Sequence, residues 1–251
     1  MTIEPKFGTK SAYEPAFDQP AYSGEGTDYI ICYVPRAGSW LLCDLLRASG
    51  RMGIPAEYFN QVVGMPQLAK RLGVTDNNTI PLDEYIHGLK KNRTTPNGMF
   101  GVKIEPRQLD PLLKLRAITT HFPNAKFIYV SRKDIVAQGV SYEMAFQTKQ
   151  WQASPDRREA IFDETRVRKS IETIARLAAE WEVFFSLHDI EPYRLDFESL
   201  TADPHAICSE ICRFVGVETD HKFSIEKSDF ERQGNSVNDD WVRRIKDLAA
   251  Y

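Results

Sequence analysis

Residues 27–42 read TDYIICYVPRAGSWLL and combine a short apolar run, a loop and the start of a helical pattern. The run TDYIICYV is rich in aromatic and β-branched residues, which is typical of a strand buried on both faces. Helical spacing of apolar residues follows the loop, at Leu41, Leu42, Leu45 and Leu46. The stretch therefore predicts a strand–loop–helix unit that opens the folded part of the chain, after an N-terminal arm at 1–26 that is either mobile or laid across a surface.

Three further strands are expected, each flanked by helical segments. The candidates are GMFGVKI at 98–104, AKFIYVS at 125–131 and PYRLDFESL at 192–200. Short apolar strands that alternate with helices predict an α/β fold with a central mainly parallel sheet flanked by helices. The length of 251 residues suits a single domain over 27–251. Residues 60–98 are less patterned and are expected to form a helical insertion over the functional face.

Composition excludes several classes of partner. The net charge of −3 provides no overall basic field, so neither nucleic acid nor an anionic membrane surface is expected to bind. No apolar run approaches the roughly 20 residues of a membrane helix, and the N-terminus lacks a secretory pattern. A cytoplasmic protein is therefore expected. The four cysteines form no C-x-x-C pair and are predicted to be buried thiols, and the five histidines are scattered, so no metal centre is expected.

The loop PRAGS at 35–39 is the first candidate site. A helix N-terminus presents unpaired N–H groups and a positive dipole end, which suit a phosphate or sulfate. Gly38 lets the backbone approach a ligand, Arg36 adds charge, and Ser39 can cap the helix or contact an anion. An ordinary turn between a strand and a helix is the alternative interpretation. The spacing differs from the Walker loop of ATP-binding proteins.

Two later segments extend this candidate site. Arg132 stands at the carboxyl end of the third strand, and Ser141 lies nine residues further on. Because ligands of open α/β sheets bind outside the carboxyl ends of the strands, Arg132 is expected in the same crevice as Arg36. The segment ERQGNS at 231–236 can offer a nest of backbone N–H groups to an anion. Each feature alone is also typical of a surface residue or loop.

Taken together, these segments resemble the nucleotide-dependent sulfotransferases, and most of all the bacterial trehalose 2-sulfotransferase family. PRAGSWLL is similar to the phosphosulfate-binding loop of that family, usually Pro-Lys/Arg-Ser-Gly-Thr/Ser-Thr. The segments PAEYFN, TPNGMFGVKI, QGVSYEMAFQTKQW and ERQ…DDW have counterparts in the same order. The resemblance implies a P-loop-like three-layer fold, 3'-phosphoadenosine-5'-phosphosulfate as sulfuryl donor without a metal, and a hydroxyl of a small carbohydrate such as trehalose as acceptor. A homodimer is the family-level expectation.

The resemblance also implies which residues bind the donor. They are Arg36, Ala37, Gly38, Ser39 and Trp40 in the first loop, Arg132 and Ser141 at the 3'-phosphate, and Arg232, Gln233 and Gly234 in the late loop. Two positions depart from the family pattern, since Ala37 stands where the loop usually has Ser and Trp40 where it often has Thr. Backbone N–H groups and Arg36 are therefore expected to make more of the contacts to the donor, and the affinity for the donor is expected to be lower.

The same resemblance nominates Glu57 as the catalytic base. In the family, the glutamate of a P-x-E-[FY]-F segment is the proposed base, and PAEYF preserves that spacing. Without the family, Glu57 would be interpreted as a surface residue or a helix cap. Lys103 is expected either to assist the leaving phosphate or the acceptor, or to pair with a structural carboxylate. Gln147, Thr148 and Trp151 match the acceptor side, although Trp151 is equally suited to partial burial in the core.

Two other functions remain open from the sequence. A small-molecule kinase on a related fold would need a Lys-Ser/Thr pair at the end of the first loop, which Gly38-Ser39-Trp40 does not supply. A non-catalytic nucleotide-binding module would account for the missing loop hydroxyls but not for Glu57.

Overall fold

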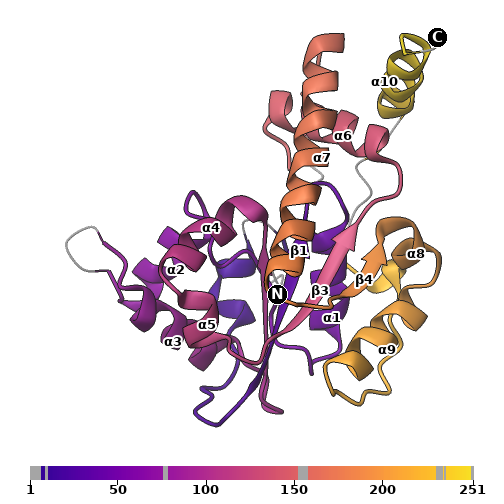
Figure 1. The fold of residues 1–251 in the computed structure, drawn as a ribbon. Helices are drawn as coiled ribbons and strands as arrows, with labels where there is room; N and C mark the ends of the chain where they lie inside the picture. Colours follow the sequence, from indigo (N-terminus) through magenta and orange to yellow (C-terminus); the bar gives the residue numbers. More distant parts are fainter. Residues whose placement is uncertain are drawn as a thin grey trace, which may run out of the picture.

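The computed structural model describes residues 7–8, 11–75, 79–151, 158–229, 234 and 236–249. Within them a four-stranded sheet has the order β2-β1-β3-β4, and every pairing is parallel. The strands are β1 (Thr27–Tyr33), β2 (Met99–Ile104), β3 (Lys126–Ser131) and β4 (Tyr193–Asp196). The four predicted strands and the parallel sheet are confirmed (Figure 1).

The first strand occupies the interior of the sheet, between β2 and β3. Its register places Tyr29 opposite Gly101 and Ile31 opposite Lys103. The ring of Tyr29 lies across Gly101, where an added Cβ would come within 2.4 Å of that ring. The Tyr29 hydroxyl donates to the carbonyl of Met52 at 2.6 Å. Gly101 therefore allows an aromatic side chain to cross the neighbouring strand beneath the site.

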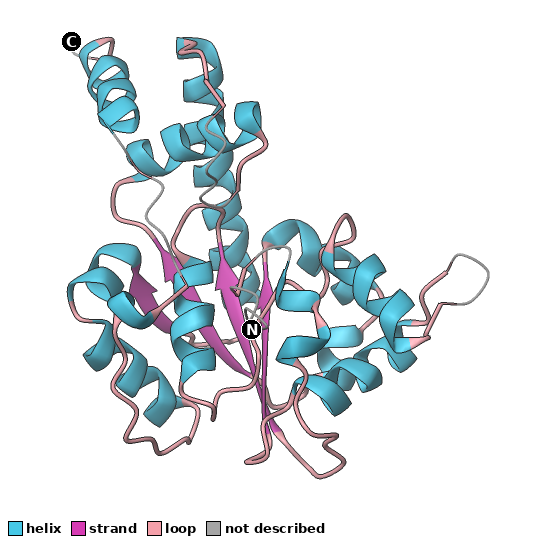
Figure 2. Cartoon of the chain, turned by 180° about the vertical axis from the view of Figure 1, so that it is seen from behind, coloured by secondary structure: helices cyan, strands magenta, loops and turns pink. Residues whose placement is uncertain are grey.

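Helices cover both faces of the sheet, which makes the three layers expected (Figures 1 and 2). α7 (Glu164–Leu187) lies over one face, where Phe185 packs near Phe127 and Tyr129. The indole of Trp181 in the same helix donates to the carbonyl of Tyr33 at 2.9 Å. α1 (Ser39–Ala48) and α9 (Pro204–Phe214) contact each other on the opposite face.

A helical tier rises beyond the carboxyl ends of the strands (Figure 1). It contains α6 (Ile135–Thr148), the first turns of α7 and α10 (Ser236–Asp247), which share a small apolar core that includes Val140, Val167 and Trp241. The remaining elements are α2 (Gly64–Leu72), α3 (Leu82–Arg93), α4 (Pro106–Lys114), α5 (Ala117–His121), α8 (Phe197–Ala202) and the short 3-10 helices η1 (Ser11–Tyr13), η2 (Pro15–Phe17) and η3 (Ile225–Lys227). α2 and α3 fall in the stretch where a helical insertion is expected.

The described part of the N-terminal segment is laid across the domain, one of the two placements the sequence left open. Ala12, Tyr13 and Phe17 are buried and belong to the main core. The wholly buried Arg93 donates to the carbonyls of Ala12 and Glu14 at 2.9 and 3.2 Å. Buried guanidinium donors and backbone acceptors satisfy each other here, so the segment is fastened to α3.

Other expectations concern cysteines, metals and membranes. All four cysteines are free and buried, as predicted. Burial raises the pKa of Cys43 to about 12 and that of Cys212 to about 11, so both thiols stay protonated at neutral pH. Across the residues that the structure describes, no cluster of metal-ligating side chains is found, and no helix is both long and apolar enough to cross a membrane.

Candidate active site

The loop between β1 and α1 contains two residues in the left-handed region of backbone conformation. Arg36 and Gly38 both have positive φ, 68° and 77°, and Gly38 caps the start of α1. A Cβ at Gly38 would meet the ring of Phe197 at 2.4 Å, so both its φ and its packing require glycine. The amide of Gln138 donates to the carbonyl of Pro35 at 2.8 Å and ties the loop to α6. The loop thus presents the N-terminus of α1 in one fixed orientation.

Arg36 reaches from this loop to α6. Its Nε donates to Ser141 Oγ at 3.0 Å and its Nη1 to the carbonyl of Trp151 at 2.8 Å. Burial, together with the charge of Arg132, lowers the pKa of Arg36 to about 10, which still leaves it charged at neutral pH. The structure therefore brings together Arg36, Ser141 and Arg132, as the sequence predicted for one crevice.

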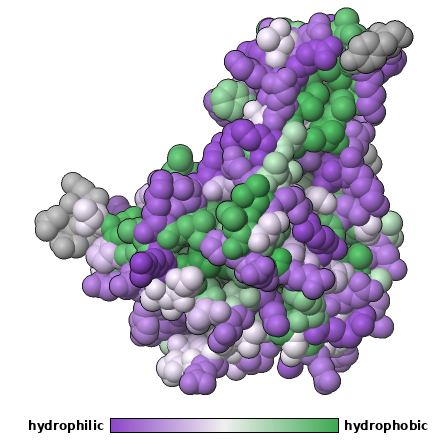
Figure 3. Space-filling model, viewed as in Figure 1, coloured by the Kyte–Doolittle hydropathy of each residue, from purple (hydrophilic) through white to green (hydrophobic). Residues whose placement is uncertain are grey.

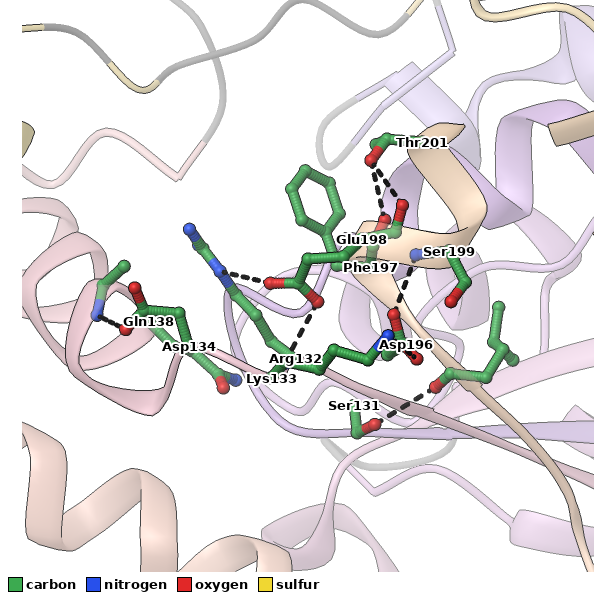
Figure 4. A network of polar contacts seen from close by, with 12 residues as sticks. Ser131, Arg132, Lys133, Asp134, Gln138, Asp196, Phe197, Glu198, Ser199 and Thr201 are labelled. Carbon is green, nitrogen blue, oxygen red and sulfur yellow. Dashed lines mark hydrogen bonds and ion pairs between the residues drawn. The ribbon is translucent and has the colours of Figure 1, made fainter. Parts of the chain in front are cut away.

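Arg132 extends from the end of β3 toward α8, which follows β4 (Figure 4). Its guanidinium lies 5.3 Å from the ring centre of Phe197, and its Nε is 3.8 Å from a carboxylate oxygen of Glu198. The second oxygen of Glu198 accepts the backbone N–H of Lys133 at 3.0 Å. The charge of Arg132 contributes to the lowered pKa of Arg36, so the two guanidinium groups repel each other, and a bound anion would reduce that repulsion.

Glu57 and Lys103 form a buried ion pair beside the loop. Lys103, in β2, is fully buried, and its Nζ lies 2.7 Å from Glu57 Oε1, while the Glu57 side chain is 12% exposed. Asn60 donates to the other carboxylate oxygen at 2.9 Å. Its own side-chain oxygen accepts the backbone N–H groups of Val62 and Val63, which turns the chain toward α2. The carboxylate is thereby fixed on both oxygens.

Two aromatic rings enclose the ammonium group of Lys103. The ring centres of Tyr33 and Trp40 each lie 4.1 Å from Nζ. Cation–π contacts of this kind stabilise a charge that burial would otherwise disfavour. Of the roles that the sequence left open for Lys103, the geometry favours an ion pair with a carboxylate, and that carboxylate is Glu57.

Charge and hydrogen bonding determine the ionisation of Glu57. Burial alone would raise the pKa of this carboxyl, but the charge and hydrogen bond of Lys103 oppose it, together with hydrogen bonds from Asn60 and Tyr33. The net effect holds the pKa of Glu57 below its ordinary value. Glu57 is therefore a carboxylate at neutral pH, the form that can accept a proton.

The residues predicted on the acceptor side lie at the end of α6. The Gln147 amide donates to Glu143 Oε1 and to the carbonyl of Ile161, and its oxygen accepts the N–H of Ile161. The Thr148 hydroxyl donates to the carbonyl of Met144. Both side chains thus hold local structure, and their contact with an acceptor stays a prediction. Trp151 is 38% exposed and leans on Tyr142, with ring centres 5.8 Å apart.

The sequence did not reveal several neighbours of these groups. Tyr33 and Asn60 bind the Glu57 carboxylate, and Arg107 pairs with Glu105 at 2.8 Å and hydrogen-bonds with Tyr142 next to Trp151. A signal for Tyr33 existed, because it ends the strand that leads into the loop. Of the predicted late loop, Gly234 is described and exposed, whereas Arg232 and Gln233 lie outside the described residues.

Comparison with solved structures shows which fold the chain adopts. A sulfotransferase from Alicyclobacillus acidocaldarius superposes with a TM-score of 0.52, at 15% identity, over 90% of this chain and 96% of that one. The sulfotransferase domain of the Synechococcus PCC 7002 olefin synthase gives a TM-score of 0.50, at 14% identity, over 93% of this chain and 98% of that one. The fold is therefore the P-loop-like sulfotransferase fold.

Sequence comparison specifies the family. The model of the Stf0 sulphotransferase family matches residues 28–247, so the chain belongs to this family and is a sulfotransferase. Trehalose 2-sulfotransferase of Mycobacterium tuberculosis is 27% identical over 256 residues, covering 87% of this chain and 94% of that protein. The trehalose 2-sulfotransferase of Mycolicibacterium smegmatis is 26% identical over 262 residues, covering 89% and 96%. This membership identifies the chain as a sulfotransferase and not as a kinase.

Proposed function

We propose that this sulfotransferase transfers the sulfuryl group of 3'-phosphoadenosine-5'-phosphosulfate to a hydroxyl of a carbohydrate such as trehalose. The observation that carries the proposal is the convergence of Arg36, Arg132 and Ser141 at the N-terminus of α1, with the Glu57–Lys103 pair beside them. Such a crevice suits a ligand with two separated anionic groups. The acceptor class is supported by the two mycobacterial relatives, which are trehalose 2-sulfotransferases.

The donor site would rely on backbone groups and arginines. Ala37 is fully buried and the indole of Trp40 is turned onto Lys103, so neither supplies the hydroxyl that the loop of this family usually carries. The N–H groups at the start of α1 and the Arg36 guanidinium would hold the phosphosulfate. Arg132 with Ser141 would hold the 3'-phosphate.

Transfer would proceed by in-line displacement at sulfur. The acceptor hydroxyl attacks the sulfur atom, the bond from sulfur to the bridging oxygen breaks, and negative charge passes to the departing nucleotide phosphate. Arg36 would stabilise that charge. The Glu57 carboxylate takes the proton of the attacking hydroxyl, and Lys103 and Asn60 hold it in position.

Ligand-dependent thermal stability tests the donor site first. Adenosine 3',5'-bisphosphate at about 100 times its dissociation constant adds roughly 2.7 kcal/mol of stability. For a domain of this size that corresponds to a melting temperature higher by roughly 5–10 °C. ADP is the matched control, since it lacks the 3'-phosphate, and we expect it to give a clearly smaller shift. Equal shifts from both nucleotides, or none from either, would contradict the proposed donor. A panel of sugars with sulfur-labelled donor then tests the acceptor.

The pH dependence of turnover tests the base. Because the pKa of Glu57 is lowered, the carboxylate persists as pH falls from neutral to the ordinary glutamate value of about 4.3, and activity declines only below it. The ion pair stabilises the fold above the unfolded-state pKa of the glutamate, and this contribution is lost as pH falls through the folded-state pKa. Initial rates measured beside circular dichroism separate protonation from unfolding. An acidic limb centred near neutral pH would exclude Glu57 in its observed surroundings.

A further inference from the structure

The earliest described residues lie outside the stretch that matches the family, 28–247, yet they border the candidate base. The Tyr13 hydroxyl is 3.4 Å from the carbonyl oxygen of Glu57, to which it donates. Phe7 packs against Trp40, the residue whose indole encloses Lys103. The N-terminal segment thus contacts the backbone of Glu57 and also Trp40, which packs against the Lys103 ammonium group.

Phe7 is fixed from several directions and is only 5% exposed. Its ring meets Phe17 edge to face at 5.1 Å, and the guanidinium of Arg47 lies 4.9 Å from its centre. Its backbone N–H donates to a carboxylate oxygen of Asp229 at 2.8 Å. A ring packed this closely has little freedom to shift, so it is a firm support for whatever rests on it.

The indole of Trp40 rests on Phe7 and faces Lys103. Its ring meets Phe7 edge to face at 5.7 Å, while Lys103 Nζ lies 4.1 Å from its centre. Tyr33 closes the other side of the ammonium at the same distance, and Glu57 takes the hydrogen bond. The two rings leave the ammonium directed toward the carboxylate. The direction of the Lys103 side chain therefore depends on where Trp40 lies.

We propose that Phe7 is a positioning residue for sulfuryl transfer: its ring holds Trp40 against Lys103, and Lys103 in turn holds the Glu57 carboxylate where the acceptor proton is received. The inference rests on the proposed role of Glu57 as base. Without the Phe7 ring, Trp40 gains room to move and water reaches the ammonium, which weakens the ion pair. The distance from Phe7 to the reacting groups makes this an indirect effect, and it is distinct from a contact with substrate.

Four other titratable side chains lie near the Glu57–Lys103 pair, and the replacement of Phe7 removes none of them. They are Tyr33 of β1, Tyr13 of η1, Cys43 of α1 and Glu105 ahead of α4. Burial raises the pKa of the two tyrosines and of the thiol, so these three groups remain neutral over the acidic range. Glu105 is unchanged in every variant compared, so a shift of the Glu57 titration that is larger in Phe7→Ala than in Phe17→Ala is attributable to Lys103 and the two rings around it.

The test compares Phe7→Ala with Phe17→Ala, since both variants remove a buried ring of the same segment but only Phe7 contacts Trp40. The carbon-13 signal of the Glu57 carboxyl, assigned by its loss in Glu57→Gln, is followed against pH, which needs no acceptor. We expect Phe7→Ala to raise the pKa of Glu57 by about one unit. Turnover on trehalose falls about tenfold, as a lost cation–π support predicts, with the KM for the donor nearly unchanged. Phe17→Ala removes one contact of Phe7 but leaves the Phe7 ring against Trp40, so we expect a clearly smaller shift of the Glu57 titration and an unchanged KM.

Phe7→Leu guards against a variant that does not fold, because it retains most of the buried volume and gives an intermediate shift. Identical titrations in the Phe7 and Phe17 variants, with Glu57→Gln inactive, would overturn the positioning role and leave the proposed function intact. Full activity of Glu57→Gln would remove the proposed base, and the role of Phe7 with it. If the Glu57 titration shifts in Phe7→Ala but the wild-type protein does not turn over trehalose, the role of Phe7 is supported and only the proposed acceptor is contradicted.

Discussion

Replacement of Glu57 by Gln is expected to lower turnover by at least about a hundredfold, the usual loss when a general base is removed, while adenosine 3',5'-bisphosphate still binds. The amide keeps the size of the side chain and an oxygen that can accept from Lys103 Nζ. In the wild-type protein this nitrogen lies 2.7 Å from the Glu57 carboxylate oxygen. The amide cannot take a proton from the acceptor hydroxyl. Single-turnover rates with bound donor, and calorimetry with the bisphosphate, measure the two effects separately.

The same change at Glu182 is the control. Glu182 also forms an ion pair, with Arg194 at 2.7 Å, but both side chains are half exposed and lie on α7 and β4 away from the loop. Glu182→Gln should leave turnover unchanged.

Glu57→Gln should also unfold at a lower temperature, because it leaves the Lys103 charge buried without a counter-charge. Breaking a buried pair in this way costs about 3–5 kcal/mol of stability. Turnover that survives in Glu57→Gln would rule out Glu57 as the base.

Removal of the Arg36 side chain should weaken binding of the bisphosphate more than any other single change in the loop. A guanidinium that makes charge-assisted hydrogen bonds to a phosphate contributes about 2–3 kcal/mol, so Arg36→Ala is expected to raise the dissociation constant roughly 30- to 150-fold. Arg36→Lys restores the charge without the planar fork and should recover only part of the affinity. Calorimetry at two salt concentrations measures both the loss and its ionic component.

The matched control removes another forked arginine. Arg194 makes two hydrogen bonds to Glu182, at 2.7 and 2.8 Å, on the exposed edge of the sheet. Arg194→Ala should leave the affinity for the bisphosphate at its wild-type value. An Arg36→Ala protein that binds the nucleotide as tightly as the wild type would place the donor somewhere other than the loop at the start of α1.

The sheet could be predicted because its strands carry a local signal. Each is a short apolar run between turn residues, and burial on both faces makes such a run apolar at successive positions. The rule that ligands bind at the carboxyl ends of parallel strands then brought Arg36 and Arg132 into one crevice. In the structure Arg132 lies near enough to Arg36 for its charge to help lower the pKa of Arg36, and the shared binding site stays a prediction.

The partners of these residues could not be predicted in the same way. The indole of Trp40 has its role because it turns onto Lys103, which lies some sixty residues later on a neighbouring strand. Gln147 matched a family segment, yet its amide is bonded to Glu143 and Ile161. Side-chain direction depends on packing between distant segments, and a single sequence contains no periodicity that reports it. For the same reason the sequence left open whether the N-terminal segment is mobile or laid across a surface, since its buried rings follow no helical or strand spacing.

The attachment of the N-terminal segment has a practical consequence for protein production. The match to the family begins at residue 28, so a shortened protein for expression could be designed to start there. That truncation would remove Ala12, Glu14 and Asp18, whose oxygens surround the fully buried guanidinium of Arg93. The guanidinium would lose these acceptors, and core residues that the segment covers would be exposed to water, so the truncated protein would be expected to aggregate during expression. The domain that can be produced begins earlier than the domain that homology outlines.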